Sequence, residues 1–144
     1  MNKEYDALLV DRFLSTAMSY PYNYGYIPQT LSEDGDPLDV FVIAPHAVAV
    51  GSVIRSRPVG VMYMEDEAGI DAKIIAVPHS KLTPIYSNVK DLNDLPQLQL
   101  EQMKHFFEHY KDLEDGKWMK FNGWGNIEEA RYEILKSIQA YIEK

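Results

Sequence analysis

The sequence contains no cysteine, and its 144 residues carry only 14 lysines and arginines against 22 aspartates and glutamates. The absence of cysteine excludes disulfide bonds, thiolate metal sites and cysteine nucleophiles. The formal net charge of −8 argues against nonspecific binding to nucleic acid or anionic membranes, because both require a cationic face. No apolar run approaches the roughly 20 residues that span a bilayer, and the charged start does not resemble a signal peptide. We therefore expect a cytoplasmic protein that binds neither membranes nor nucleic acid.

The length and a hydrophobic fraction of 46% are those of one ordinary globular domain, predicted here to cover residues 1–144. Apolar and polar residues alternate over 8–14, with Arg12 on the same face as Leu8, Val10 and Leu14, and this period-2 pattern predicts a first strand. Further short β-rich runs predict strands over residues 37–44, 52–57, 59–64 and 72–77, the last two forming a hairpin with an acidic tip.

The last quarter of the chain is predicted to be helical. Pro96 can open a first helix, whose apolar residues recur at i, i+3 and i+4 as far as Leu113, and Gly116 is a plausible stop. A second helix is predicted after Asn126, with a buried stripe made of Ile127, Ala130, Ile134, Leu135, Ile138 and Ile142. Many short strands followed by two helices predict a mainly β protein of the α+β class: a small closed β-barrel with the helices packed outside.

Acidic residues concentrate in two short segments. Residues 33–39 hold Asp34, Asp36 and Asp39, and residues 65–71 form the second segment. Such segments can be solvated turns, but a glycine and a proline stiffen the first, and its last aspartate opens an apolar strand. Two carboxylates about 4 Å apart repel by roughly 4 kcal/mol at an effective dielectric near 20, so crowding several of them requires a neutralising cation. Carboxylate oxygens are the ligands that Mg²⁺ prefers, which predicts a magnesium site.

Cationic and phenolic side chains accompany these acids. Lys73 follows Asp71 by two positions, so both side chains project from one strand face. Each such residue taken alone has an ordinary structural explanation. Together with the acids they suit a small polyanion, since metals can bind some of its oxygens while arginine, lysine and tyrosine donate to the rest. The other members of this set are Arg12, Tyr20, Tyr24, Tyr110 and Lys111.

The same segments resemble the family I soluble inorganic pyrophosphatases, particularly those of bacteria. Residues 34–40 (DGDPLDV) match the family pattern D-[SGDN]-D-[PE]-[LIVMF]-D-[LIVMGAC]. The resemblance covers nearly the whole chain in family order, through Val10-Asp11-Arg12, Tyr20-Pro21-x-Asn23-Tyr24-Gly25, Arg57-Pro58-Val59-Gly60, Asp66-Glu67-x-Gly69-x-Asp71-x-Lys73 and His105-Phe106-Phe107-x-x-Tyr110-Lys111.

The resemblance implies an OB-like five-stranded barrel and the Mg²⁺-dependent hydrolysis of pyrophosphate to two orthophosphates. It implies three to four Mg²⁺ ions per site with substrate, with Mn²⁺ or Zn²⁺ as possible substitutes. Asp34, Asp39 and Asp71 would hold the main ion, Asp39 would also bridge to a second, and Asp66 and Asp71 would hold a third that arrives with the substrate.

The remaining roles follow from the same resemblance. Asp36 would be the general base that acts on the magnesium-activated water. The leaving phosphate would be bound by Arg12, Tyr110 and Lys111. Four further residues would contact phosphate or support the ligand network: Tyr24, Lys73, Tyr20 and Glu67.

The family pattern also bears on assembly and chain length. It implies a homohexamer made of two trimers, with His105, His109 and Asp112 near a subunit interface. Family members carry a further N-terminal segment with a Lys-x-Glu pair upstream of the arginine, whereas only eleven residues precede Arg12 here. We therefore expect the natural chain to be longer. From the sequence shown, we expect poor solubility and slower turnover.

Two other functions fit parts of the sequence. His105-Phe106-Phe107-Glu108-His109 matches the H-x-x-E-H pattern of inverted zinc peptidases, although no third ligand is evident. A noncatalytic OB module could stack nucleobases on its tyrosines, but the sequence lacks the positive groove that such binding requires. Zinc-dependent peptide cleavage and metal-independent, salt-sensitive oligonucleotide binding would identify these two alternatives.

Overall fold

The computed structural model describes residues 8–144. Its helices are the 3₁₀-helix η1 (Leu92–Asp94), α1 (Gln97–His109) and α2 (Ile127–Glu143). Five strands form one sheet in the order β1-β2-β4-β3-β5. The strands are β1 (Asn23–Tyr26), β2 (Asp39–Val42), β3 (Ser56–Asp66), β4 (Gly69–Pro78) and β5 (Met119–Gly125).

The centre of the sheet confirms the predicted hairpin. β3 and β4 pair antiparallel down to Asp66 and Gly69, so the acidic segment forms the tip of the hairpin. The prediction of two strands separated by Pro58 is wrong, because β3 continues through the proline and its register shifts between Pro58 and Gly60. A bulge tolerates proline because one residue leaves the hydrogen-bond ladder there.

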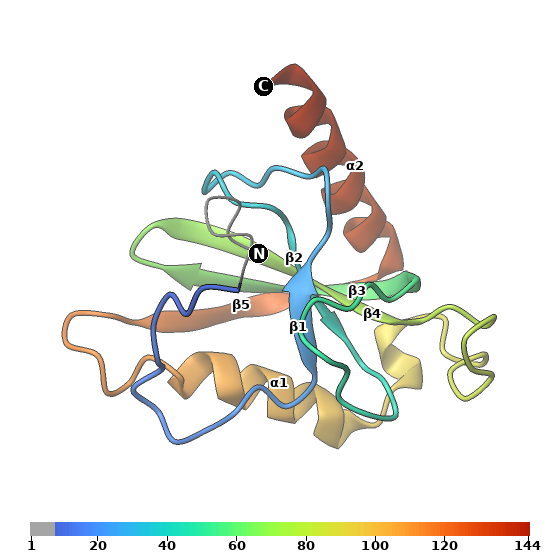
Figure 1. The fold of residues 1–144 in the computed structure, drawn as a ribbon, viewed down its shortest axis with the longest axis horizontal. Coiled ribbons are helices and arrows are strands. Elements are labelled where there is room, and N and C mark those ends of the chain that lie inside the picture. Colours follow the sequence, from blue (N-terminus) through green and yellow to red (C-terminus); the bar gives the residue numbers. More distant parts are fainter. Residues whose placement is uncertain (1–7) are drawn as a thin grey trace.

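The two helices cover opposite faces of the sheet (Figure 1). The alternation of β3 sends Met62 and Met64 into the larger core with Phe107 of α1. Val61, on the other face of the strand, packs with Ala130 of α2 in a smaller cluster. Both helices were predicted from their apolar spacing, and their existence is confirmed. None of the described helices is long and apolar enough to cross a bilayer.

The predicted strand over residues 8–14 does not form. The backbone there has no regular structure, and Leu9, Val10 and Phe13 are exposed. Period-2 alternation favours a strand but is not sufficient, because a strand also needs a neighbour with which to pair. Arg12 therefore does not share a strand face with its apolar neighbours.

The predicted closure of the sheet into a barrel is likewise not found in residues 8–144. β1 and β5 stand at opposite ends of the strand order, and no pairing joins them. The described fold is thus an open five-stranded sheet with two flanking helices.

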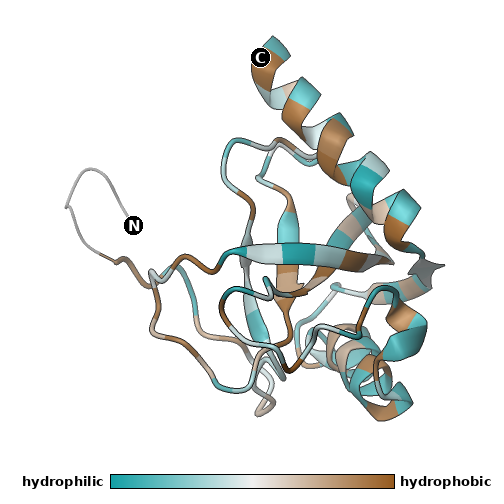
Figure 2. Ribbon diagram, turned by 90° about the vertical axis from the view of Figure 1, so that its right-hand side faces the viewer, coloured by the Kyte–Doolittle hydropathy of each residue, from teal (hydrophilic) through white to brown (hydrophobic). Residues whose placement is uncertain are grey.

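The predicted buried stripe of α2 is only partly correct. Ala130 is buried and Ile134 packs against the smaller core, but Leu135 and Ile142 are 66% and 68% exposed. Ile138 is exposed as well. The C-terminal part of α2 extends away from the sheet (Figure 1), and apolar and polar bands alternate along it (Figure 2). The apolar pattern therefore covers more of this helix than the sheet can bury.

Helix α1 begins after Pro96 as predicted but ends at His109, before the predicted stop. Tyr110 is its C-terminal cap, and its backbone N–H donates to the carbonyl of Phe106. The chain then turns through residues 110–118 toward β5. This loop, which we call the α1–β5 loop, lies next to the site described below.

Candidate active site

The centre of the site is the ammonium group of Lys73. Its Nζ donates to Tyr24 Oη at 2.9 Å, to Asp39 Oδ2 at 2.9 Å and to Asp71 Oδ2 at 2.8 Å. The register of the sheet makes these contacts possible, because Asp39 of β2 pairs with Lys73 of β4, and Asp71 projects from the same face two residues earlier. Four of the residues predicted to form the site are therefore brought together.

Burial sets the electrostatics of this group. The Lys73 side chain is only 4% exposed; burial alone lowers its pKa, but Tyr24, Asp71 and Asp39 outweigh this and raise it well above the usual value. Burial raises the pKa of Asp71, and the charge of Lys73 opposes that rise. Burial also raises the pKa of the Tyr24 phenol, which therefore stays protonated and can donate a hydrogen bond.

Aromatic rings form the wall beside the lysine. Tyr20 stacks on Tyr24 with ring centroids 4.8 Å apart, and Lys73 Nζ lies 4.7 Å from the ring centroid of Phe107. Tyr110 stacks on Phe106 at 5.4 Å, and burial raises the pKa of its phenol to about 12. Burial raises the pKa of Tyr20 as well. These phenols keep their protons at neutral pH and can act as donors to an anion.

A second group of charges joins the α1–β5 loop to the hairpin tip. Lys111 Nζ lies 3.6 Å from Asp66 Oδ2, and Lys117 Nζ lies 3.5 Å from Glu67 Oε1. In the same loop, Glu114 Oε1 accepts from Arg12 Nη1 at 2.5 Å.

Sequence analysis did not single out Glu114 or Lys117. Both are ordinary charged residues in a polar segment, and only their spacing after Lys111 could have drawn attention to them. The second carboxylate oxygen of Glu114 is buried without a partner in the described residues.

The acidic loop between β1 and β2 is held by its own backbone. Asp34 Oδ1 accepts the backbone N–H of Asp36 at 2.9 Å, and the carbonyl of Asp36 accepts the N–H of Ser32 at 2.7 Å. Gly35 has a φ of 88°, a conformation that favours glycine. Asp34 and Asp36 are exposed, whereas Asp39 is half-buried.

The donor set fits a hard divalent cation. Asp34 and Asp71 line one pocket of about 290 Å³, and Asp34 and Asp39 both raise the pKa of Asp71, which places these carboxylates in one electrostatic group. Within residues 8–144, however, no three acidic or histidine side chains converge closely enough to hold an ion in this arrangement. Lys73 lies between Asp39 and Asp71 instead, so an ion would have to share or replace the lysine contacts.

The histidines of α1 lie elsewhere. The rings of His105 and His109 are 4.5 Å apart on an exposed face, and His109 Nδ1 lies 2.8 Å from Asp112 Oδ2. Even with Asp112, the acidic and histidine side chains of the described residues form no group of three that could hold a metal ion there, as the zinc-peptidase alternative would require.

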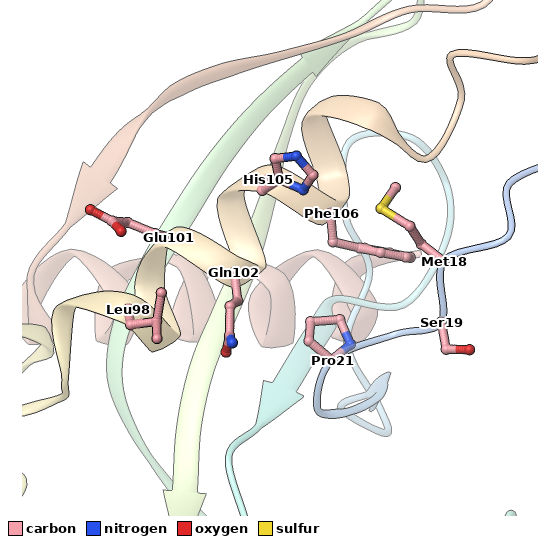
Figure 3. A pocket seen from close by; sticks show the side chains of 8 residues that line it. All are labelled: Met18, Ser19, Pro21, Leu98, Glu101, Gln102, His105 and Phe106. Carbon is pink, nitrogen blue, oxygen red and sulfur yellow. The ribbon is translucent and has the colours of Figure 1, made fainter.

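An open groove runs between α1 and residues 18–21 (Figure 3). In the figure, Phe106 reaches from the helix toward Met18, and His105 lies at the edge of the groove. None of the residues predicted to bind magnesium or phosphate lines it. The residues that do are Met18, Ser19, Pro21, Leu98, Glu101, Gln102, His105 and Phe106.

Comparison with known proteins relates this chain to one family. A model of the family described as "Inorganic pyrophosphatase" matches residues 1–142. The inorganic pyrophosphatase of Pseudomonas aeruginosa is 62% identical over 141 residues, which make up 98% of this chain and 81% of that protein. The inorganic pyrophosphatase of Escherichia coli K12 is 62% identical over 139 residues, or 96% of this chain and 79% of that protein.

Solved structures agree with the sequence relatives. The inorganic pyrophosphatase from Helicobacter pylori superposes with a TM-score of 0.94 at 50% identity, covering 99% of this chain and 84% of that one. The enzyme of the same name from Thermus thermophilus gives a TM-score of 0.91 at 40% identity, covering 98% of this chain and 81% of that one.

Proposed function

The chain belongs to the family I soluble inorganic pyrophosphatases, metal-dependent enzymes that hydrolyse pyrophosphate to two orthophosphates, and from that premise we propose which of its residues carry the reaction. The metal of this family is generally Mg²⁺. The observation that supports the assignment of residues best is the Lys73 centre, where one buried cation already joins Asp39 and Asp71.

For the metals, we propose that Asp34, Asp39 and Asp71 hold the main Mg²⁺, and that Asp39 also bridges to a second ion. Asp66 and Asp71 would hold a third ion that arrives with the substrate, for three to four ions in all. Bound Mg²⁺ supplies a water nucleophile of lowered pKa and neutralises charge on the phosphates. Mn²⁺ or Zn²⁺ would be accepted in its place, since both take carboxylate ligands.

For the proton transfer, we propose Asp36 as the general base. Its carboxylate is exposed and has no ion-pair partner among the described residues. Its backbone is fixed because its N–H donates to Asp34 Oδ1 and its carbonyl accepts from the N–H of Ser32. A fixed carboxylate that no cation neutralises can accept a proton from the attacking water.

For the leaving phosphate, we propose Arg12, Tyr110 and Lys111 as ligands. Lys111 now contacts Asp66 and Arg12 contacts Glu114. A cation bound at Asp66 would compete with Lys111 and free its ammonium for phosphate. Cationic donors then meet the charge that develops on the leaving group, as phosphoryl transfer requires.

The remaining residues would support this arrangement. Tyr24 and Lys73 would contact phosphate or the network of metal-ligand carboxylates, and Tyr20 would keep Tyr24 in place by stacking. Glu67 would help to retain the metals at the hairpin tip, where Lys117 now pairs with it.

The direct test is a phosphate-release assay with pyrophosphate and Mg²⁺. We expect two phosphates per pyrophosphate, loss of activity when a chelator removes the metal, and recovery when excess Mg²⁺ is added back. Repeating the assay with Mn²⁺ or Zn²⁺ tests the substitutes. Pyrophosphate hydrolysis that continues in the presence of chelator would contradict the proposed metal roles.

A further inference from the structure

One buried polar side chain has no part in the chemistry above. Thr30, in the turn after β1, is 3% exposed. Its hydroxyl donates to the carbonyl of Ile27 at 2.5 Å and accepts the backbone N–H of Leu38 at 2.9 Å. Serine and threonine hydroxyls are the small side-chain groups that donate and accept at once. Thr30 therefore ties the residue that follows β1 to the residue that precedes β2.

These contacts fix the two ends of the acidic loop. Leu38 is 1% exposed and lies directly before Asp39. The carbonyl of Leu38 accepts the N–H of Ile27 at 2.9 Å, so both backbone groups of Leu38 are hydrogen-bonded to the segment that follows β1. The N–H of Leu31 donates to the carbonyl of Ser137, which attaches the start of the same loop to α2.

The turn that presents Thr30 has an uncommon backbone. Gln29 has a φ of 59°, the only positive φ outside glycine in the described residues. Pro28 precedes it, and proline followed by a residue of positive φ is the pattern of a type II turn, which usually uses glycine at that second position. A non-glycine residue keeps such a conformation where surrounding contacts determine it. The bond from Thr30 to Ile27 closes this turn.

We propose that Thr30 is a positioning residue that sets the place of Asp39 and of the loop carrying Asp34 and Asp36, and thereby the affinity for magnesium. The inference rests on the proposed ligand roles of Asp34 and Asp39. Thr30 acts through the Leu38 backbone and touches neither metal nor substrate. Loss of its hydroxyl leaves the Leu38 N–H buried without a partner, so the strand start shifts to recover a hydrogen bond.

The test compares Thr30→Val, which keeps the shape but removes the hydroxyl, with Thr30→Ser, which keeps the hydroxyl. The readout is the binding of MgCl₂ alone, measured by titration calorimetry. We expect about 10-fold weaker binding for Thr30→Val, the scale seen when groups that orient metal ligands are removed. Thr30→Ser should bind within about 2-fold of the unchanged protein, because the orienting hydroxyl remains.

Activity gives a second readout. The Mg²⁺ concentration for half-maximal phosphate release should rise about 10-fold in Thr30→Val and stay near normal in Thr30→Ser. Thr83→Val is the matched control, since the Thr83 hydroxyl also accepts a backbone N–H. Thr83 follows the C-terminal end of β4, whereas Asp71 and Lys73 lie near the N-terminal end of that strand. Unchanged Mg²⁺ affinity in Thr30→Val, or equal losses in the valine and serine variants, would overturn the inference.

Two further measurements keep the result interpretable. Asp39→Asn distinguishes failure of the proposed ligand set from failure of the positioning role. If Asp39→Asn binds Mg²⁺ normally, the proposed ligand set is wrong. If Asp39→Asn loses Mg²⁺ affinity but Thr30→Val does not, only the positioning role of Thr30 is wrong. If Thr30→Val does not fold, hydrogen exchange of the Leu38 amide in the unchanged protein decides. Strong protection supports the hydroxyl contact, and an unprotected Leu38 amide refutes it.

Discussion

Carboxylates that bind an anion through metal ions repel one another when the metal ions are absent, so another charge must hold them together. In this chain, lysines neutralise them: Lys73 pairs with Asp39 and Asp71, and Lys111 lies near Asp66. The same lysines carry the donors that a phosphate would need. If the proposed metal and phosphate roles hold, the two kinds of binding are linked, because each metal ion that takes over a carboxylate would reverse the local charge and release a lysine.

The general-base role of Asp36 can be tested by Asp36→Asn. This change keeps the size of the side chain and its backbone contacts, but the amide cannot accept a proton. We expect turnover at saturating Mg²⁺ to fall by about 10²-fold or more, the usual scale for losing a positioned base, with little change in Mg²⁺ affinity. Steady-state phosphate release and calorimetry measure the two quantities.

Asp115→Asn is the matched control for Asp36→Asn. It removes one exposed carboxylate that has no ion-pair partner in the described residues, and its activity should stay within about 2-fold, as for ordinary surface changes. Turnover like that of the unchanged protein in Asp36→Asn at every pH would remove Asp36 from the mechanism.

Part of the site follows from residue spacing alone. Asp71 and Lys73 are two apart in a strand, so their shared face was predictable, and the structure confirms it through their 2.8 Å contact. The contact of Lys73 with Tyr24 and Asp39 was not predictable from spacing, because it depends on the register among β1, β2 and β4. Residue chemistry grouped them as suited to a polyanion, and only the family resemblance gave each of them a position in one site beforehand.

At the level of elements, β3 depends on one close approach. A side chain at Gly60 would overlap that of Leu92 in η1. We expect Gly60→Ala to lower the free energy of unfolding by about 1–3 kcal/mol, because overpacking forces the helix or the strand to move. Urea denaturation measures this change.

Gly25→Ala in β1 is the control for Gly60→Ala. Its added methyl group meets nothing within 4 Å, and its backbone does not need glycine. We expect an effect within about 0.5 kcal/mol, the range of ordinary surface substitutions. Equal destabilisation by both alanine variants would mean that loss of glycine in a strand, not contact with η1, sets the effect.

The elements themselves were predicted where one signal sufficed. β2, the β3–β4 hairpin and both helices follow from apolar periodicity and turn residues. The prediction of a strand over residues 8–14 was wrong because alternation says nothing about a pairing partner. The predicted burial of Leu135, Ile138 and Ile142 in α2 was wrong because an apolar period does not reveal how far the sheet extends beneath the helix.

For the whole molecule, the exposed apolar surface is the feature that a single copy leaves unexplained. Large apolar side chains are exposed in the first described segment and along α2, among them Phe13 at 87% and Ile142 at 68%. Single copies of soluble proteins rarely expose extended apolar patches, which more often mark contacts between chains. This exposure supports contacts between copies of the chain, whereas the homohexamer of two trimers is a proposal that rests on the family resemblance.

The proposed hexamer predicts a light-scattering mass near six times the 16.5 kDa of one chain at neutral pH. We place His105, His109 and Asp112 near a subunit interface, since all three are exposed on one side of the end of α1.

The same interface predicts that the assembly is sensitive to acid, because acid protonates histidines. Asp112 can neutralise the charge of His109, but two protonated copies of His105 brought together would repel. Glu101 and Glu108 on the same helix reduce this repulsion. Smaller species should therefore increase in acid, and His105→Gln should keep the large species there. A mass of one chain at neutral pH and high concentration would refute the assembly. Acid dissociation that is unchanged in His105→Gln would refute the role of His105, because the glutamine variant lacks the charge to which we assign the repulsion.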